Sequence, residues 1–201
     1  MKYFRKFLCW LVSTRVYDFV IKSVIPYVRF TFYYPKFNGF QFGEARQLLR
    51  DGDIILCKDN KKLTTFLIGG EWSHAALCVD WLSDEILEMD HTGFHHGTFF
   101  DLCKQSDEIC ILRCEDWDEW YCGQVIAQAW ALRSKGVGYD GEFKLGVEAL
   151  YCSELIYQAD FERRLCVNLD DLVGLGREYI SPTGLYNAEN VNVIYESGVP
   201  F

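Results

Sequence analysis

Short apolar segments between residues 53 and 114, separated by turn sequences, constrain the fold of this chain more than any other feature. An Asp-Gly pair precedes "DIILCK", and a Gly-Gly break precedes the segment centred on Ala75–Val79. A Ser-Asp turn leads into "DEILEMDHTG", and "EICILRCED" forms a fourth segment. Apolar runs of this length between such turns are typical of β-strands. Short turns between strands indicate antiparallel neighbours.

Helical patterns flank these strands. After a loop around "PKFNGF", we expect a short helix in "GEARQLL". Residues 117–135 place Val125, Ile126, Ala129 and Leu132 on one helical face. A second helix is expected over Cys152–Phe161, and a final strand near Val191–Tyr195. This order predicts an α+β fold, an antiparallel sheet or barrel packed against helices.

Charge divides the chain into two parts. Seven basic residues and one acidic residue give residues 1–36 a net charge of +6, whereas the remainder carries −15. An acidic body argues against nucleic acid as a partner, because phosphate binding needs a basic face. We therefore predict an N-terminal basic amphipathic segment, residues 1–45, and a catalytic domain, residues 46–201.

The N-terminal segment is expected to be helical over residues 2–25. Charged residues at Arg15, Asp18 and Lys22 interrupt it before the roughly 20 apolar residues that span a membrane. Two interpretations stay open: the helix packs on the domain, or residues 1–36 make a peripheral membrane contact. A cytoplasmic protein, membrane-associated in the second interpretation, is the prediction.

Nine cysteines cannot all pair within one chain, so reduced thiols in a cytosol-like compartment are expected. Cys57, Cys78, Cys110 and Cys166 lie in apolar runs, where free cysteine behaves as a small hydrophobe. Without a Cys-x-x-Cys pair, a zinc ribbon is not indicated. We expect no metal and no cofactor.

Cys152 is the candidate nucleophile because it stands where a helix is expected to begin. A helix N-terminus and an adjacent histidine both lower a thiol's pKa. His74 opens a buried strand, which would hold a base rigidly, whereas His95 and His96 are expected in a loop. Glu88 and Asp90 share a strand face, so periodicity alone leaves open which carboxylate orients the imidazole.

Six segments in order resemble the circularly permuted NlpC/p60 superfamily of papain-like fold, in particular its YiiX/YebB-like and poxvirus-related cysteine hydrolases. In that group the histidine strand precedes the cysteine helix. The resemblance covers about Leu48 to Tyr195 and rests on "DGDIILC", "WSHAALCVD", "ILEMD", "GVGYDGEF", "YCSELIYQA" and "ISPTGLY".

The resemblance implies Cys152 as nucleophile, His74 as base and Glu88 as the orienting carboxylate. It also implies a substrate cleft near Tyr139 and Asp140. Ser73 and Tyr151, next to the base and the nucleophile, are expected at the same cleft.

The predicted activity is that of a cysteine-dependent hydrolase or acyltransferase, acting on an amide or ester bond of a peptide or lipid through a thioester. One alternative is a papain-like shell that binds a lipid or peptide without catalysis. Another is a structural or host-interaction protein. Composition does not decide between monomer and dimer.

Overall fold

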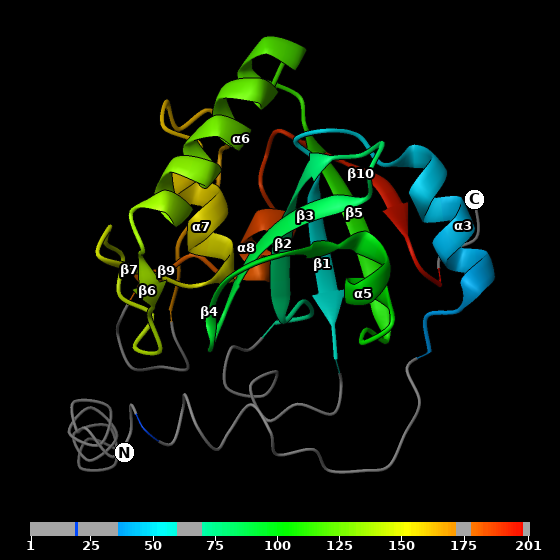
Figure 1. Ribbon diagram of the computed structural model, residues 1–201, viewed down its shortest axis with the longest axis horizontal. Helices are drawn as coiled ribbons and strands as arrows, with labels where there is room; N and C mark the ends of the chain where they lie inside the picture. The colour runs from blue at the N-terminus through cyan, green and yellow to red at the C-terminus, as the bar shows by residue number, and fades with distance from the viewer. Residues whose placement is uncertain (1–18, 20–35, 60–69, 172–177, 199–201) are drawn as a thin grey trace.

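The computed structural model describes residue 19 and residues 36–59, 70–171 and 178–198 (Figure 1). The helix expected over residues 2–25 lies outside the described residues, apart from Phe19. Within the described part, no helix is long and apolar enough to cross a membrane.

A six-stranded antiparallel sheet forms the centre of the domain, in the order β10-β5-β1-β2-β3-β4. Its strands are β1 (Ile54–Lys58), β2 (His74–Asp80), β3 (Glu85–Asp90), β4 (Gly93–Thr98), β5 (Glu108–Cys114) and β10 (Val191–Glu196). Two short pairs lie outside it: β6 (Gly138–Tyr139) with β7 (Ala149–Leu150), and β8 (Asp170–Asp171) with β9 (Glu178–Tyr179).

Helices cover both faces of the sheet, with α6 and α7 on one side and α3 on the other (Figure 1). The helices are α3 (Gly39–Leu48), α5 (Phe99–Cys103), α6 (Glu119–Ser134), α7 (Cys152–Ala159) and α8 (Pro182–Tyr186). Two apolar clusters result, one under α6, α7 and α8 and one under α3 and α5.

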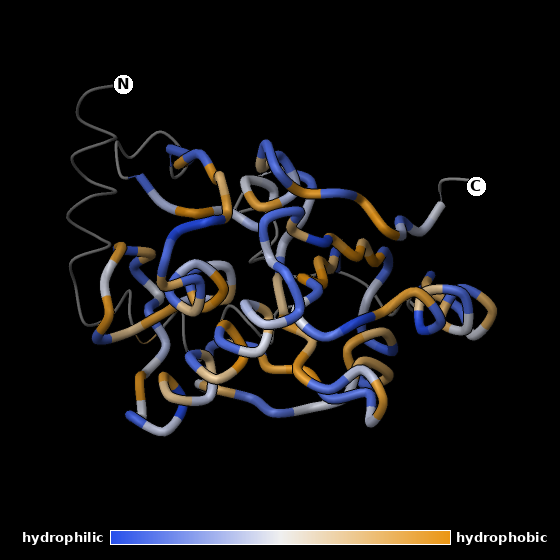
Figure 2. Tube along the Cα trace, turned by 90° about the horizontal axis from the view of Figure 1, so that it is seen from above, coloured by the Kyte–Doolittle hydropathy of each residue, from blue (hydrophilic) through white to orange (hydrophobic). Residues whose placement is uncertain are grey.

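Strand alternation divides the apolar residues between the two clusters. On β2, Ala75 and Leu77 pack towards α7, whereas Ala76 and Cys78 pack towards α5. Because both faces are buried, the central strands read as continuous apolar runs in the sequence. Along the chain, short hydrophobic and hydrophilic stretches alternate (Figure 2).

The predicted α+β class and antiparallel sheet are confirmed, but three local predictions are wrong. "TGFHHGTFF" contains β4 rather than a loop, because an edge strand that is half exposed needs no apolar alternation. Helix α3 begins earlier than expected, at Gly39, because the Asn38 side chain accepts hydrogen bonds from the Phe40 and Gln41 amides. Cys166 is exposed rather than packed in an apolar run.

The "DGDII" segment fixes the sheet to its surroundings. Asp53 is fully buried, and its carboxylate accepts hydrogen bonds from Arg113 Nε (2.7 Å) and Nη2 (2.8 Å) and from the Arg50 amide (2.7 Å). Gly52 has φ +82°, and a Cβ there would lie 2.6 Å from the Cys122 sulfur. Both residues therefore serve the fold rather than the chemistry.

Candidate active site

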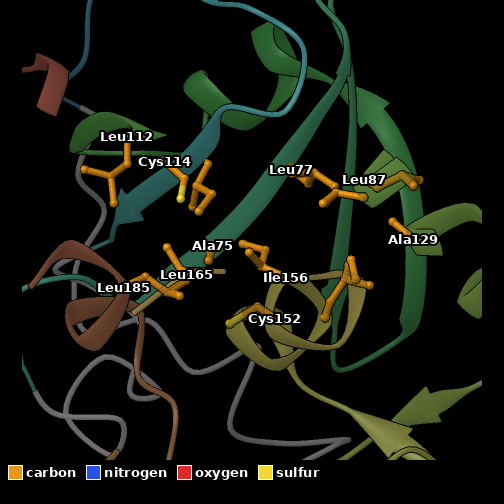
Figure 3. Close-up of a cluster of buried hydrophobic side chains, with 14 of the residues drawn as sticks. Ala75, Leu77, Leu87, Leu112, Cys114, Ala129, Cys152, Ile156, Leu165 and Leu185 are labelled. Carbon is orange, nitrogen blue, oxygen red and sulfur yellow. The ribbon is translucent and has the colours of Figure 1, made fainter. Parts of the chain in front are cut away.

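Three elements bring the predicted catalytic side chains together. His74 is the first residue of β2, Glu88 lies on the neighbouring strand β3, and Cys152 is the first residue of α7. Helix α7 packs on β2, so that Cys152 and Ile156 face the sheet near Ala75 (Figure 3).

The His74 imidazole has two side-chain partners, Glu88 and Cys152. Its Nε2 atom lies 2.6 Å from Glu88 Oε2. Cys152 is the second side-chain partner of the imidazole and, together with Glu88, raises its pKa. A carboxylate, an imidazole and a thiol are thus neighbours, the combination that activates a nucleophilic cysteine.

Local structure at the start of α7 favours a thiolate. The N-cap residue, Tyr151, supplies no side-chain hydrogen bond to the first turn. The backbone amides of Ser153 and Ala75 instead lower the pKa of the Cys152 thiol. The partial positive charge at a helix N-terminus adds to their effect.

Electrostatics in the group favour a thiolate–imidazolium pair. Burial opposes the charge on His74, but the hydrogen bonds to Cys152 and Glu88 outweigh it and raise the pKa of His74 to about 10. Burial also opposes the Cys152 thiolate. The interaction with His74 and the positive charge of the imidazolium outweigh burial and bring the pKa of this thiol below its ordinary value. The same histidine lowers the pKa of Glu88 against the effect of burial.

Asp90, the other carboxylate on this strand face, is engaged elsewhere. Its Oδ1 atom accepts hydrogen bonds from the Thr92 amide (2.7 Å), from the Thr92 hydroxyl (2.7 Å) and from His95 Nε2 (2.9 Å). It closes the β3–β4 turn. Glu88 is therefore the carboxylate that the structure brings to His74.

The residues expected at a cleft occupy different places. Tyr139 and Asp140 are half-buried, and Asp140 accepts hydrogen bonds from the Glu142 (2.8 Å) and Lys144 (2.6 Å) amides, which shapes the loop before α7. Ser73 donates to the Cys57 carbonyl at 3.3 Å. Tyr151 is only 1% exposed and packs against Phe143 and Tyr179, and its hydroxyl accepts a hydrogen bond from the Ile180 amide.

Two side chains of α7, Glu154 and Gln158, hold the loop that leads into this helix. Glu154 Oε1 accepts from the Gly146 amide at 2.7 Å, and Gln158 Nε2 donates to the Gly146 carbonyl at 2.7 Å. Two exposed apolar side chains, Leu145 and Val147, flank this anchored glycine. Spacing of four residues on one helix face is the sequence signal that could have paired Glu154 with Gln158.

Comparison with known proteins bears on the family and the fold of the chain. Residues 48–195 match the family described as permuted papain-like amidase enzymes, YaeF/YiiX, C92 family. Among solved structures, the chain is similar to the metalloprotein yiiX from Escherichia coli O157:H7, with a TM-score of 0.59 and 14% sequence identity over 74% of this chain and 97% of that one. No curated protein matches.

The neighbour's description as a metalloprotein raises the question of a metal here. Among the residues that the structure describes, no group of three or more His, Cys, Asp or Glu side chains is arranged to hold a metal ion. The donor set described does not fit a metal site.

Proposed function

The chain belongs to the C92 family of permuted papain-like amidases, and from this premise we propose that Cys152, His74 and Glu88 form a triad that cleaves amide bonds. The 2.6 Å contact between His74 and Glu88, with Cys152 as the second partner of the imidazole, carries the proposal. A cysteine hydrolase is the activity for which this arrangement is suited.

The reaction starts from the thiolate–imidazolium pair. The Cys152 sulfur attacks the substrate carbonyl carbon, and a carbon–sulfur bond forms as the carbonyl oxygen becomes an oxyanion. An amide at the start of α7 is placed to donate to that oxyanion. His74 gives its proton to the leaving nitrogen, the carbon–nitrogen bond breaks, and a thioester remains. His74 then takes a proton from water, the hydroxide attacks the thioester, and the acid and the thiolate are released.

We further propose that the group next to the scissile amide is apolar. The loop before α7 is anchored at Gly146 by Glu154 and Gln158, and it exposes Leu145 and Val147 shortly before Cys152 in the chain. Exposed apolar side chains on one loop mark a surface that binds apolar ligand atoms. A peptide with apolar residues and a fatty-acyl amide both satisfy this description. Membrane contact through residues 1–36 remains a prediction outside the described residues.

Incubation with p-nitroanilides and p-nitrophenyl esters of acetyl, octanoyl and short peptidyl groups tests the proposal. Release of p-nitroaniline and a mass adduct on Cys152 are expected, with faster turnover of the octanoyl and apolar peptidyl substrates. Cys152→Ala should remove both signals. Cys166→Ala, a change at an exposed cysteine outside the site, should keep them.

Two outcomes would count against an enzyme. Turnover that survives Cys152→Ala would place the chemistry elsewhere. The protein could also bind octanamide or a peptide and yet form no Cys152 adduct and release no p-nitroaniline. That result would favour the alternative, a binding module with a papain-like shell.

A further inference from the structure

The segment Ile180–Thr183, which leads from β9 into the first turn of α8, contacts both halves of the proposed site. On the cysteine side, both residues next to Cys152 bond to the backbone of Ile180. The Ile180 amide donates to Tyr151 Oη at 2.9 Å, and Ser153 Oγ donates to the Ile180 carbonyl at 2.7 Å. Ile180, Tyr151 and Ser153 are all buried, so water does not compete for these bonds.

On the histidine side, the same segment holds the chain that enters β2. Thr183 Oγ1 accepts hydrogen bonds from the Glu71 amide at 2.9 Å and from the Trp72 amide at 3.0 Å. Gly70 has φ +81°, and a Cβ on it would lie 2.4 Å from Thr183 Oγ1. Glycine is thus needed for the chain to approach the hydroxyl so closely.

His74 depends on this entry segment because it is the first residue of its strand. Before it, Ser73 is tied to β1 by one backbone bond, from its amide to the Cys57 carbonyl at 3.0 Å. The two preceding residues, Trp72 and Glu71, donate their amide hydrogen bonds to the Thr183 hydroxyl. Displacement of these residues would rotate or shift the imidazole, and a shift of about 1 Å is enough to weaken a catalytic contact.

We propose that Thr183 is a positioning residue for the proposed triad: through one hydroxyl, it fixes the entry to His74 relative to the Ile180 backbone that holds Cys152. This inference rests on the proposed function. Thr183 touches neither the thiol nor the imidazole in any described hydrogen bond, and it acts through the backbone of Glu71 and Trp72. The first turn of α8, which contains Thr183, is itself fixed, because the Ser181 hydroxyl caps this helix by accepting a hydrogen bond from the Gly184 amide at 2.7 Å.

The test is the pH dependence of Cys152 alkylation by iodoacetamide in the folded protein, read by mass spectrometry. Thr183→Val keeps the side-chain shape but removes the acceptor. We expect the apparent pKa of the thiol to rise by about one unit, which corresponds to about tenfold slower alkylation at acidic pH. Thr183→Ser restores the acceptor and should restore the wild-type profile.

Thr98→Val is the matched control. Thr98 also accepts a backbone hydrogen bond, from Asp101 at 3.1 Å, but it caps α5 on the other face of the sheet. Its loss should lower thermal stability without moving the Cys152 profile. A Thr183→Val protein that is destabilised but keeps the wild-type profile overturns the positioning role.

Gly70→Ala gives a second perturbation, in case Thr183→Val does not fold. It keeps the hydroxyl but pushes it away, and the apparent pKa of Cys152 should rise in the same direction. An unchanged profile in Gly70→Ala also overturns the inference. Failure of the proposed function gives a different result: the wild-type profile would then be that of an ordinary thiol and insensitive to His74→Ala.

Discussion

His74 bonds to Glu88 diagonally across strands β2 and β3 rather than to the residue opposite it. The register pairs Ala76 with Glu88, so that His74, two residues earlier, faces Asp90. Diagonal neighbours on one sheet face lie within reach of long side chains. A glutamate at 88 therefore reaches the imidazole, while the nearer Asp90 is committed to the Thr92 turn.

Glu88→Gln tests this diagonal contact. The amide keeps the size of the side chain but removes the charge that favours the imidazolium, so the pKa of His74 should fall and amide hydrolysis should drop on the order of 10²-fold or more. Asp90→Asn, on the same strand face, is the control and should leave kcat/KM within a few-fold. Equal losses in both variants would argue against a specific orienting role for Glu88.

The pH profile of p-nitroanilide hydrolysis should have a late alkaline limb. Because the pKa of His74 is raised to about 10, the imidazolium keeps its proton until the pH passes that value, and the rate should fall only there. On the acid side the thiolate persists below the ordinary Cys value of 9.0, since the pKa of Cys152 is lowered. A plateau between the two limbs follows, measurable as kcat/KM against pH. An alkaline limb below pH 8 would contradict the ion pair.

Selective labelling of thiols should follow from burial. Burial raises the pKa of Cys114 and Cys122 to about 11, so both remain thiols at neutral pH. Iodoacetamide at pH 6 should therefore modify Cys152 ahead of these two cysteines, as peptide mapping would show. Loss of this preference is expected in His74→Ala, because burial then acts on the Cys152 thiolate without the opposing imidazolium.

Asp53→Ala should destabilise the domain without affecting the chemistry. It removes a buried carboxylate that accepts three hydrogen bonds. Arg113 then keeps only its hydrogen bond to the Leu48 carbonyl among those described. Since Arg113 is partly exposed, we expect a loss of about 2–3 kcal/mol in the free energy of unfolding, below the value for a fully buried pair. Urea unfolding measures it. Asp101→Ala, at an exposed pair with Lys104, should show no measurable loss.

Glu154→Gln should change how stability depends on pH. Burial, with the nearby Asp140 charge, raises the pKa of Glu154 from 4.5 to about 7. The folded state therefore binds a proton that the unfolded state releases, and wild-type stability should fall as the pH rises from about 4.5 to about 7. The difference from Glu154→Gln should approach about 3 kcal/mol. A constant difference across this range would contradict the shift.

Much of the fold could be predicted from the sequence because the central strands are buried on both faces. β2 and β5 therefore read as clear apolar runs, and α6 and α7 show helical periodicity. The edge strand β4 could not be found in this way, since its residues are glycine, histidine and threonine at half-exposed positions. Its structure comes from pairing with β3, a tertiary effect.

Prediction of the site was more uneven. The placement of Cys152 at a helix start followed from the glycine-rich loop before it, and His74 from its place at a strand start. Periodicity left the choice between Glu88 and Asp90 open, and only the family resemblance favoured Glu88. The hydrogen bonds that engage Asp90 in the turn are not contained in periodicity. Thr183 had no local signal at all, because its partners Glu71 and Trp72 are more than 100 residues away in the sequence.

The position of Ile180–Thr183 late in the sequence has a consequence for biosynthesis. During translation, His74, Glu88 and Cys152 are all made before the segment that ties their elements together, and before β10, which pairs with β5 at the edge of the sheet. A nascent chain that has just exposed Cys152 still lacks these contacts. The bonds that Ile180 and Thr183 make to the elements of the proposed triad therefore form only after all three of its residues have been synthesised.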